Sequence, residues 1–105
     1  MKILLYDWLT SIGNKKLIQD MQQYGWEIKI LQREIKDHFK DSDFENILCR
    51  EMEDVDAVFS FNFYPAISRN CYIKKKIYIS YCFDTPLFNL FSKEAQYDIN
   101  YFFCF

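Results

Sequence analysis

The sequence predicts a three-layer α/β domain with a Rossmann-like (flavodoxin-like) parallel sheet in the strand order 2-1-3-4-5. Its 105 residues suffice for one domain. Half of the residues are hydrophobic and 20% are aromatic, which is enough to build a buried core. Short apolar segments alternate along the chain with amphipathic ones, and this β-α alternation is typical of parallel sheets with right-handed crossovers.

The first expected strand covers residues 3–6 and is apolar on both faces. After a polar stretch, residues 15–24 carry an apolar stripe with helical spacing, and Gly25 ends this helix because glycine readily adopts a positive φ. In residues 26–31, apolar side chains alternate with Glu27 and Lys29. Such alternation indicates a strand with one solvated face or an edge strand.

Ser42 and Glu45 have the spacing of a capping box and predict the start of a second helix. The third strand is expected at residues 57–61, which are almost wholly apolar. Pro65 suits the first turn of a third helix, where the missing N–H is not needed. The basic run at residues 74–76 suits the C-terminus of that helix, where cations complement the helix dipole.

The last part of the sequence predicts a fourth strand at residues 77–81 and a short apolar helix that begins at Pro86. A fifth strand is expected at residues 101–105. Because the first, third and fourth strands are apolar on both faces, they belong in the middle of the sheet, and the charged second strand belongs at an edge. The order 2-1-3-4-5 satisfies both conditions and creates a switch point between strands one and three.

Ligands of open α/β sheets bind beyond the carboxyl ends of the strands, at the switch point. Carboxylate, hydroxyl, amide and aromatic side chains follow these strand ends, a combination that suits a sugar or another polyol. The candidate ligand-binding residues are Asp7, Trp8, Thr10, Asn62, Tyr64 and Asp84.

Each of these residues also has a purely structural interpretation. Asp84 is better explained as a helix N-cap before Pro86, whereas Asn62 fits a turn as well as it fits a binding site. Trp8 and Tyr64 could pack beneath the loops. Asp7 has the strongest functional case because it ends a central strand, although it could also form a turn.

Several classes of function lack support in the sequence. A net charge of -2 argues against nucleic-acid binding, and the apolar runs are too short to span a bilayer. The four cysteines form no Cys-x-x-Cys pair and lie away from His38, so we expect no metal. Gly13 is isolated from any phosphate-binding fingerprint, so we expect no nucleotide cofactor. With no leader pattern at its start, the chain is expected to be cytoplasmic.

Four segments, at residues 3–8, 56–65, 78–81 and 84–87, together resemble the N-terminal domain of CgeB-like (spore maturation protein) glycosyltransferases of bacteria. The most specific parts are residues 59–65 and 84–86. The resemblance implies a GT-B enzyme with two Rossmann-like domains, in which the N-terminal domain faces a sugar or glycan acceptor. It also implies that the partner of this domain is a C-terminal nucleotide-sugar-binding domain, so we expect a non-catalytic piece of a longer protein with no catalytic residue of its own.

Two other interpretations remain open from the sequence. A receiver-like signalling module is disfavoured because Asn62, and not aspartate, follows the third strand. A non-catalytic interaction or small-ligand-binding domain would use its exposed aromatic residues. The fifth strand is apolar on both faces and lacks the charges or proline that protect most edge strands, so we expect self-association through residues 99–105.

Overall fold

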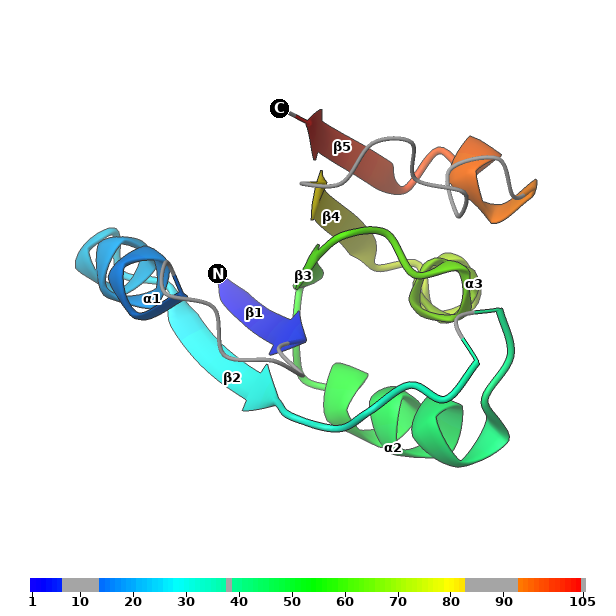
Figure 1. The fold of residues 1–105 in the computed structure, drawn as a ribbon. Helices are drawn as coiled ribbons and strands as arrows, with labels where there is room; N and C mark the ends of the chain where they lie inside the picture. Colours follow the sequence, from blue (N-terminus) through cyan, green and yellow to red (C-terminus); the bar gives the residue numbers. More distant parts are fainter. Residues whose placement is uncertain (7–13, 38, 83–92, 105) are drawn as a thin grey trace.

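The computed structural model describes residues 1–6, 14–37, 39–82 and 93–104. Strands and helices alternate through this part of the chain (Figure 1). In order, the elements are β1 (Lys2–Tyr6), α1 (Asn14–Gln23), β2 (Glu27–Leu31), α2 (Ser42–Met52), β3 (Ala57–Phe61), α3 (Pro65–Lys74), β4 (Ile77–Cys82), the 3-10 helix η2 (Lys93–Gln96) and β5 (Asn100–Cys104).

The five strands form one parallel sheet in the order β2-β1-β3-β4-β5, which confirms the predicted flavodoxin-like topology. In the register, Leu5 of β1 lies beside Phe59 of β3, and Phe59 lies beside Ile79 of β4. The apolar strands β1, β3 and β4 occupy the interior of the sheet, and β2 with its charged residues lies at one edge. The apolar pattern therefore identified both the central and the edge strands correctly.

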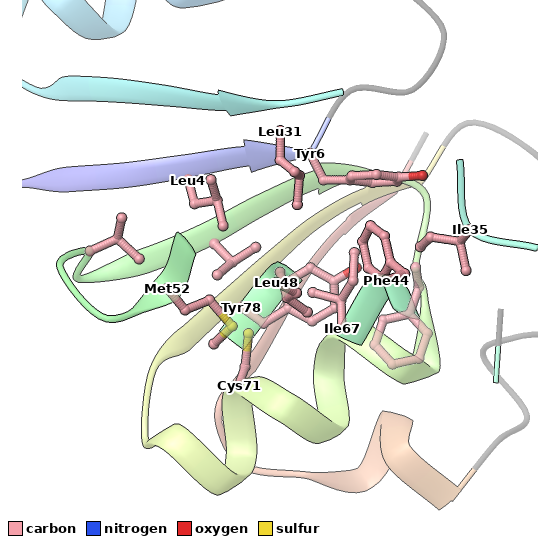
Figure 2. Packing of buried hydrophobic residues seen from close by; sticks show 13 residues of the cluster. Leu4, Tyr6, Leu31, Ile35, Phe44, Leu48, Met52, Ile67, Cys71 and Tyr78 are labelled. Carbon is pink, nitrogen blue, oxygen red and sulfur yellow. The ribbon is translucent and has the colours of Figure 1, made fainter. Parts of the chain in front are cut away.

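One face of the sheet packs against α2 and α3 (Figure 2). Phe44, Leu48 and Met52 lie on one side of α2, at most 1% exposed, as expected for the apolar stripe of an amphipathic helix. They meet residues of the strands and of α3 in the larger of two hydrophobic clusters. The cluster contains Leu4, Tyr6, Leu31, Ile35, Phe44, Leu48, Met52, Val55, Val58, Phe63, Ile67, Cys71 and Tyr78.

The opposite face of the sheet carries α1 (Figure 1). Met21 of α1 packs with Ile3 and Leu5 of β1 and with Phe59 of β3 in the smaller cluster. Successive residues of each strand point to opposite faces, so β1 supplies Leu4 to one cluster and Leu5 to the other. This division produces the predicted three layers.

The start of α2 differs from the prediction by one residue. The N-cap of α2 is Asp41 and not Ser42, since the Asp41 carboxylate accepts a hydrogen bond from Phe44 N (3.2 Å). In return, Glu45 accepts one from Asp41 N (3.0 Å). Asp41 also accepts a bond from Lys36 N (2.9 Å), so its two carboxylate oxygens each accept from a different backbone N–H, one in the preceding loop and one in the helix.

Other predicted element boundaries agree within one residue. Gly25 adopts a φ of 83° after α1, as expected for a glycine that ends a helix. The basic run begins at Lys74, the last residue of α3, and Lys75 takes a left-handed conformation at the C-cap. The short helix expected at Pro86 lies outside the described residues. The sequence did not predict η2, which precedes β5.

Candidate functional site

The switch point of the sheet lies between β1 and β3, where the strand order reverses. Of the six candidate residues, Asn62 and Tyr64 belong to the described part of the chain. They follow β3 directly and lead into α3, so they lie at the carboxyl edge, as predicted. Asp7, Trp8, Thr10 and Asp84 lie outside the described residues, and their convergence on this edge stays a prediction.

Residues 62–64 form a sharp connection, here called the β3–α3 turn. Asn62 has a φ of 68°, in the left-handed region that asparagine tolerates better than most side chains. Its N–H donates to the Tyr81 carbonyl of β4 (2.7 Å), and its carbonyl accepts from the Ser60 hydroxyl (2.7 Å). The structural interpretation of Asn62 as a turn residue is therefore confirmed, and its backbone is fixed on both sides.

The hydroxyl groups of Ser60 and Tyr78, together called the hydroxyl relay, connect the two ends of this turn by hydrogen bonds. Tyr64 N donates to the Tyr78 hydroxyl (3.1 Å), and the Tyr78 and Ser60 oxygens lie 2.5 Å apart. Because the Ser60 proton is engaged by the Asn62 carbonyl, the Tyr78 hydroxyl must donate to Ser60. Each hydroxyl thus donates once and accepts at least once, which satisfies both groups in the core.

The Tyr78 side chain is held firmly in the core. Its side chain is completely buried, and its ring stacks on Phe63 with the centroids 5.6 Å apart. Burial raises the pKa of Tyr78, so the hydroxyl keeps its proton and remains a donor at any physiological pH. The sequence analysis missed Ser60 and Tyr78 as supporting residues. The available signal was the presence of hydroxyl side chains in strands that are otherwise apolar.

Tyr64 connects the β3–α3 turn to the end of β1. Its ring meets the ring of Tyr6 edge to face, with centroids 5.2 Å apart and an interplanar angle of 87°. Tyr6 is itself fixed, because its hydroxyl donates to the Arg33 carbonyl (2.6 Å) and its ring contacts Phe44. Tyr64 is only half-buried, and burial raises the pKa of its hydroxyl. The switch point therefore carries the neutral phenol of Tyr64 beside the ring of Tyr6, which is held in place by its own contacts.

The N-terminus of α3 lies at the same edge. Pro65 occupies its first turn, and Ser68 N donates to the Tyr64 carbonyl (3.0 Å) in the first helical hydrogen bond. An amide and a phenol next to a helix N-terminus can recognise hydroxyl groups by hydrogen bonding. Within the described ranges, no three metal-ligating side chains converge and no helix has the length and apolarity needed to cross a membrane.

A second polar cluster, also missed from the sequence, joins α2, α3 and η2. Arg69 of α3 pairs with Glu45 of α2 and lies 3.8 Å from a carboxylate oxygen of Glu94, which is buried. Arg69 also donates to the Phe39 carbonyl (2.8 Å). The carboxylates of Glu45 and Glu94 face the Arg69 guanidinium, and these contacts connect α2, α3 and η2 on one side of the sheet.

Comparison of the chain with known protein families, with curated proteins and with solved structures finds no match. The fold and the described carboxyl edge are therefore the observations on which a function can be argued.

Proposed function

We propose that the chain is the acceptor-side domain of a GT-B glycosyltransferase. It binds the hydroxyl groups of a sugar at the carboxyl edge between β1 and β3. The observation that carries the proposal is the β3–α3 turn. The buried hydroxyls of Ser60 and Tyr78 hold it in place, and it contains Asn62 and Tyr64 beside the switch point.

The chemistry of the turn supports a polyol better than a phosphorylated ligand. Asn62 supplies both a donor and acceptors, and Tyr64 supplies a phenol and a ring. Residues 62–64 themselves include no basic side chain. Arg69, which follows the turn in α3, faces the carboxylates of Glu45 and Glu94, and these offset its charge. Sugars are recognised by this pairing of aromatic groups with neutral hydrogen-bonding groups.

The resemblance to CgeB-like enzymes converges on the same place. Its most specific segment, residues 59–65, contains Ser60, Asn62 and Tyr64, which form and anchor the β3–α3 turn. In GT-B enzymes, transfer takes place between two Rossmann-like domains. The sheet described here has a Rossmann-like order, which is compatible with one such domain, so we expect this chain to bind an acceptor without transferring sugar to it.

Isothermal titration calorimetry tests the proposal by measuring the affinity of the chain for glucose, galactose, N-acetylglucosamine and maltose. Asn62→Gly is the sharpest variant, because glycine keeps the left-handed backbone and removes only the amide side chain. We expect it to weaken sugar binding about tenfold, which corresponds to about 1.4 kcal/mol. Tyr64→Phe should also weaken binding, whereas the control Tyr24→Phe, at a residue 82% exposed after α1, should have no effect.

Failure of all four sugars to bind would contradict the proposal, as would unchanged affinity in both turn variants. Product formation from a nucleotide sugar by the purified chain alone would contradict the expectation that it binds without transfer.

A further inference from the structure

β5, at one edge of the sheet, contains no charged residue and is rich in aromatic residues. Among the described residues, β5 pairs with β4 on one side, where Tyr101 lies beside Ile79 and Phe102 lies beside Ser80. Tyr101 is 53% exposed and Phe102 is 37% exposed. Residues 100–104 include no charged side chain and no proline. Edge strands of stable monomers usually carry such groups, because they prevent pairing with another chain.

The opposite edge of the sheet has that protection. In β2, Glu27 is exposed, and Lys29 forms ion pairs with Glu51 (2.8 Å) and Asp54 (3.2 Å). An additional strand at this edge would have to accommodate these charges. The two edges therefore differ in charge, and β5 is the one suited to pairing.

β5 is also held in place as a formed strand. The Asn100 side chain donates to the Glu94 carbonyl (2.7 Å) and accepts from the Ser68 hydroxyl (2.8 Å). Further along the strand, the ring of Phe102 lies 5.1 Å from that of Phe63. A partner strand would meet an edge that is already ordered, which lowers the entropic cost of association.

We propose that a second copy of this chain pairs its β5 antiparallel to the first, about a two-fold axis perpendicular to the sheet. This axis keeps equivalent faces of the two sheets on the same side, so the pair forms one continuous sheet. With Phe102 of each copy at the centre, the two side chains become a cross-strand aromatic pair. The proposal does not depend on the sugar site at the carboxyl edge.

The charge pattern favours a closed pair over other arrangements. Two copies of β5 meet without like charges, because neither strand carries any. Pairing β5 with β2 of another copy would set Glu27 and Lys29 against an uncharged aromatic strand and would lead to open chains. A contact of one strand per copy is smaller than the standard interface of about 800 Å² per partner. We therefore expect a dissociation constant on the order of 1–100 μM.

Sedimentation velocity of the full chain from about 1 to 500 μM, which spans that range, tests the pairing. Wild type should change from monomer to dimer. Tyr101→Lys should weaken the dimer at least tenfold, because it sets a charge on each copy at the shared edge. The matched control is Ile30→Lys, at a residue 48% exposed on β2, and it should dimerise like wild type.

A monomer throughout the concentration range would overturn the proposal. Equal loss of dimer in both variants, no loss in either, or growth into larger species would overturn it as well. Hydrogen exchange keeps the test decisive if Tyr101→Lys fails to fold. In wild type, amides of residues 100–104 should exchange more slowly at high than at low concentration, and unchanged exchange there would exclude pairing through β5.

Discussion

At the scale of single residues, the Tyr78 hydroxyl is the group on which the β3–α3 turn depends most directly. It is completely buried and bridges Tyr64 N and Ser60 Oγ. In Tyr78→Phe, the Tyr64 N–H loses this acceptor while the ring still fills the core. We expect a loss of about 1–3 kcal/mol in the free energy of unfolding, measured by urea denaturation.

Tyr24→Phe is the control for this substitution, because Tyr24 is 82% exposed and its hydroxyl is available to water. It should change stability by no more than about 0.5 kcal/mol. Equal stability of Tyr78→Phe and wild type would mean that the hydroxyl relay contributes nothing to the fold.

Asp54 makes the stability of the fold depend on pH in the acid range. It accepts hydrogen bonds from Lys2 and Lys29, which lower its pKa from the ordinary value of 3.8 to about 2. These contacts stabilise the folded state fully above about pH 4, where the carboxylate is ionised in both states. Their contribution is lost as the pH falls towards 2 and the folded carboxyl gains its proton.

We therefore expect Asp54→Asn to show a smaller loss of melting temperature than wild type between about pH 4 and pH 2 at low salt. Because Asp54 is exposed, added salt should reduce the difference. Asp20→Asn, at an exposed aspartate of α1, serves as control. Parallel melting curves for wild type and Asp54→Asn across this range would show that the ion pairs do not contribute.

At the scale of elements, the end of α3 contains a correctable source of strain. Lys75 N donates to the Tyr72 carbonyl (3.3 Å) and Lys76 N to the Cys71 carbonyl (2.8 Å), which is the Schellman pattern of helix termination. This pattern usually has glycine at the left-handed position, but here Lys75 occupies it with a φ of 59°. A side chain in this conformation costs about 1–2 kcal/mol.

Lys75→Gly should raise the free energy of unfolding by about 0.5–1 kcal/mol, since part of the relieved strain is offset by the greater freedom of glycine in the unfolded chain. The adjacent Lys76→Gly is the matched control and should not stabilise, because Lys76 has no positive φ to relieve. Chemical denaturation of both variants measures the difference, and destabilisation by Lys75→Gly would contradict this account of the helix end.

The elements that sequence reasoning identified correctly are those fixed by local pattern. The apolar β3 and the charged β2 revealed their places in the sheet through the residues that each must bury or expose. The start of α2 was misplaced by one residue because Asp41 and Ser42 are both good caps. The choice depends on the preceding loop, where Lys36 N also needs the Asp41 carboxylate.

The candidate site was predictable only in part for a related reason. Asn62 and Tyr64 could be identified because they directly follow an apolar strand. Ser60 and Tyr78 are 18 residues apart in sequence and meet only because β3 and β4 are neighbours with Ser60 beside Ser80. Such a contact depends on sheet register, which the order of elements alone does not specify.

At the scale of the whole molecule, the parallel order separates two surfaces for which we propose different roles. The carboxyl edge brings the β3–α3 turn next to the end of β1, where we propose that a sugar binds. The lateral edge at β5 presents an uncharged strand, where we propose that a second copy pairs. The axis of that pairing leaves the carboxyl edge of each copy open, so a dimer could bind sugar at both sites.

The central claim is that the carboxyl edge at the switch point is the sugar-binding surface. Titration of the isotopically labelled chain with maltose and N-acetylglucosamine, followed by backbone amide resonances, tests it most directly. We expect saturable shifts concentrated at residues 62–68, with little change at Tyr24 and Tyr72 near the opposite edge. Saturable shifts centred on that opposite edge, or no saturable shifts with either sugar, would contradict the account.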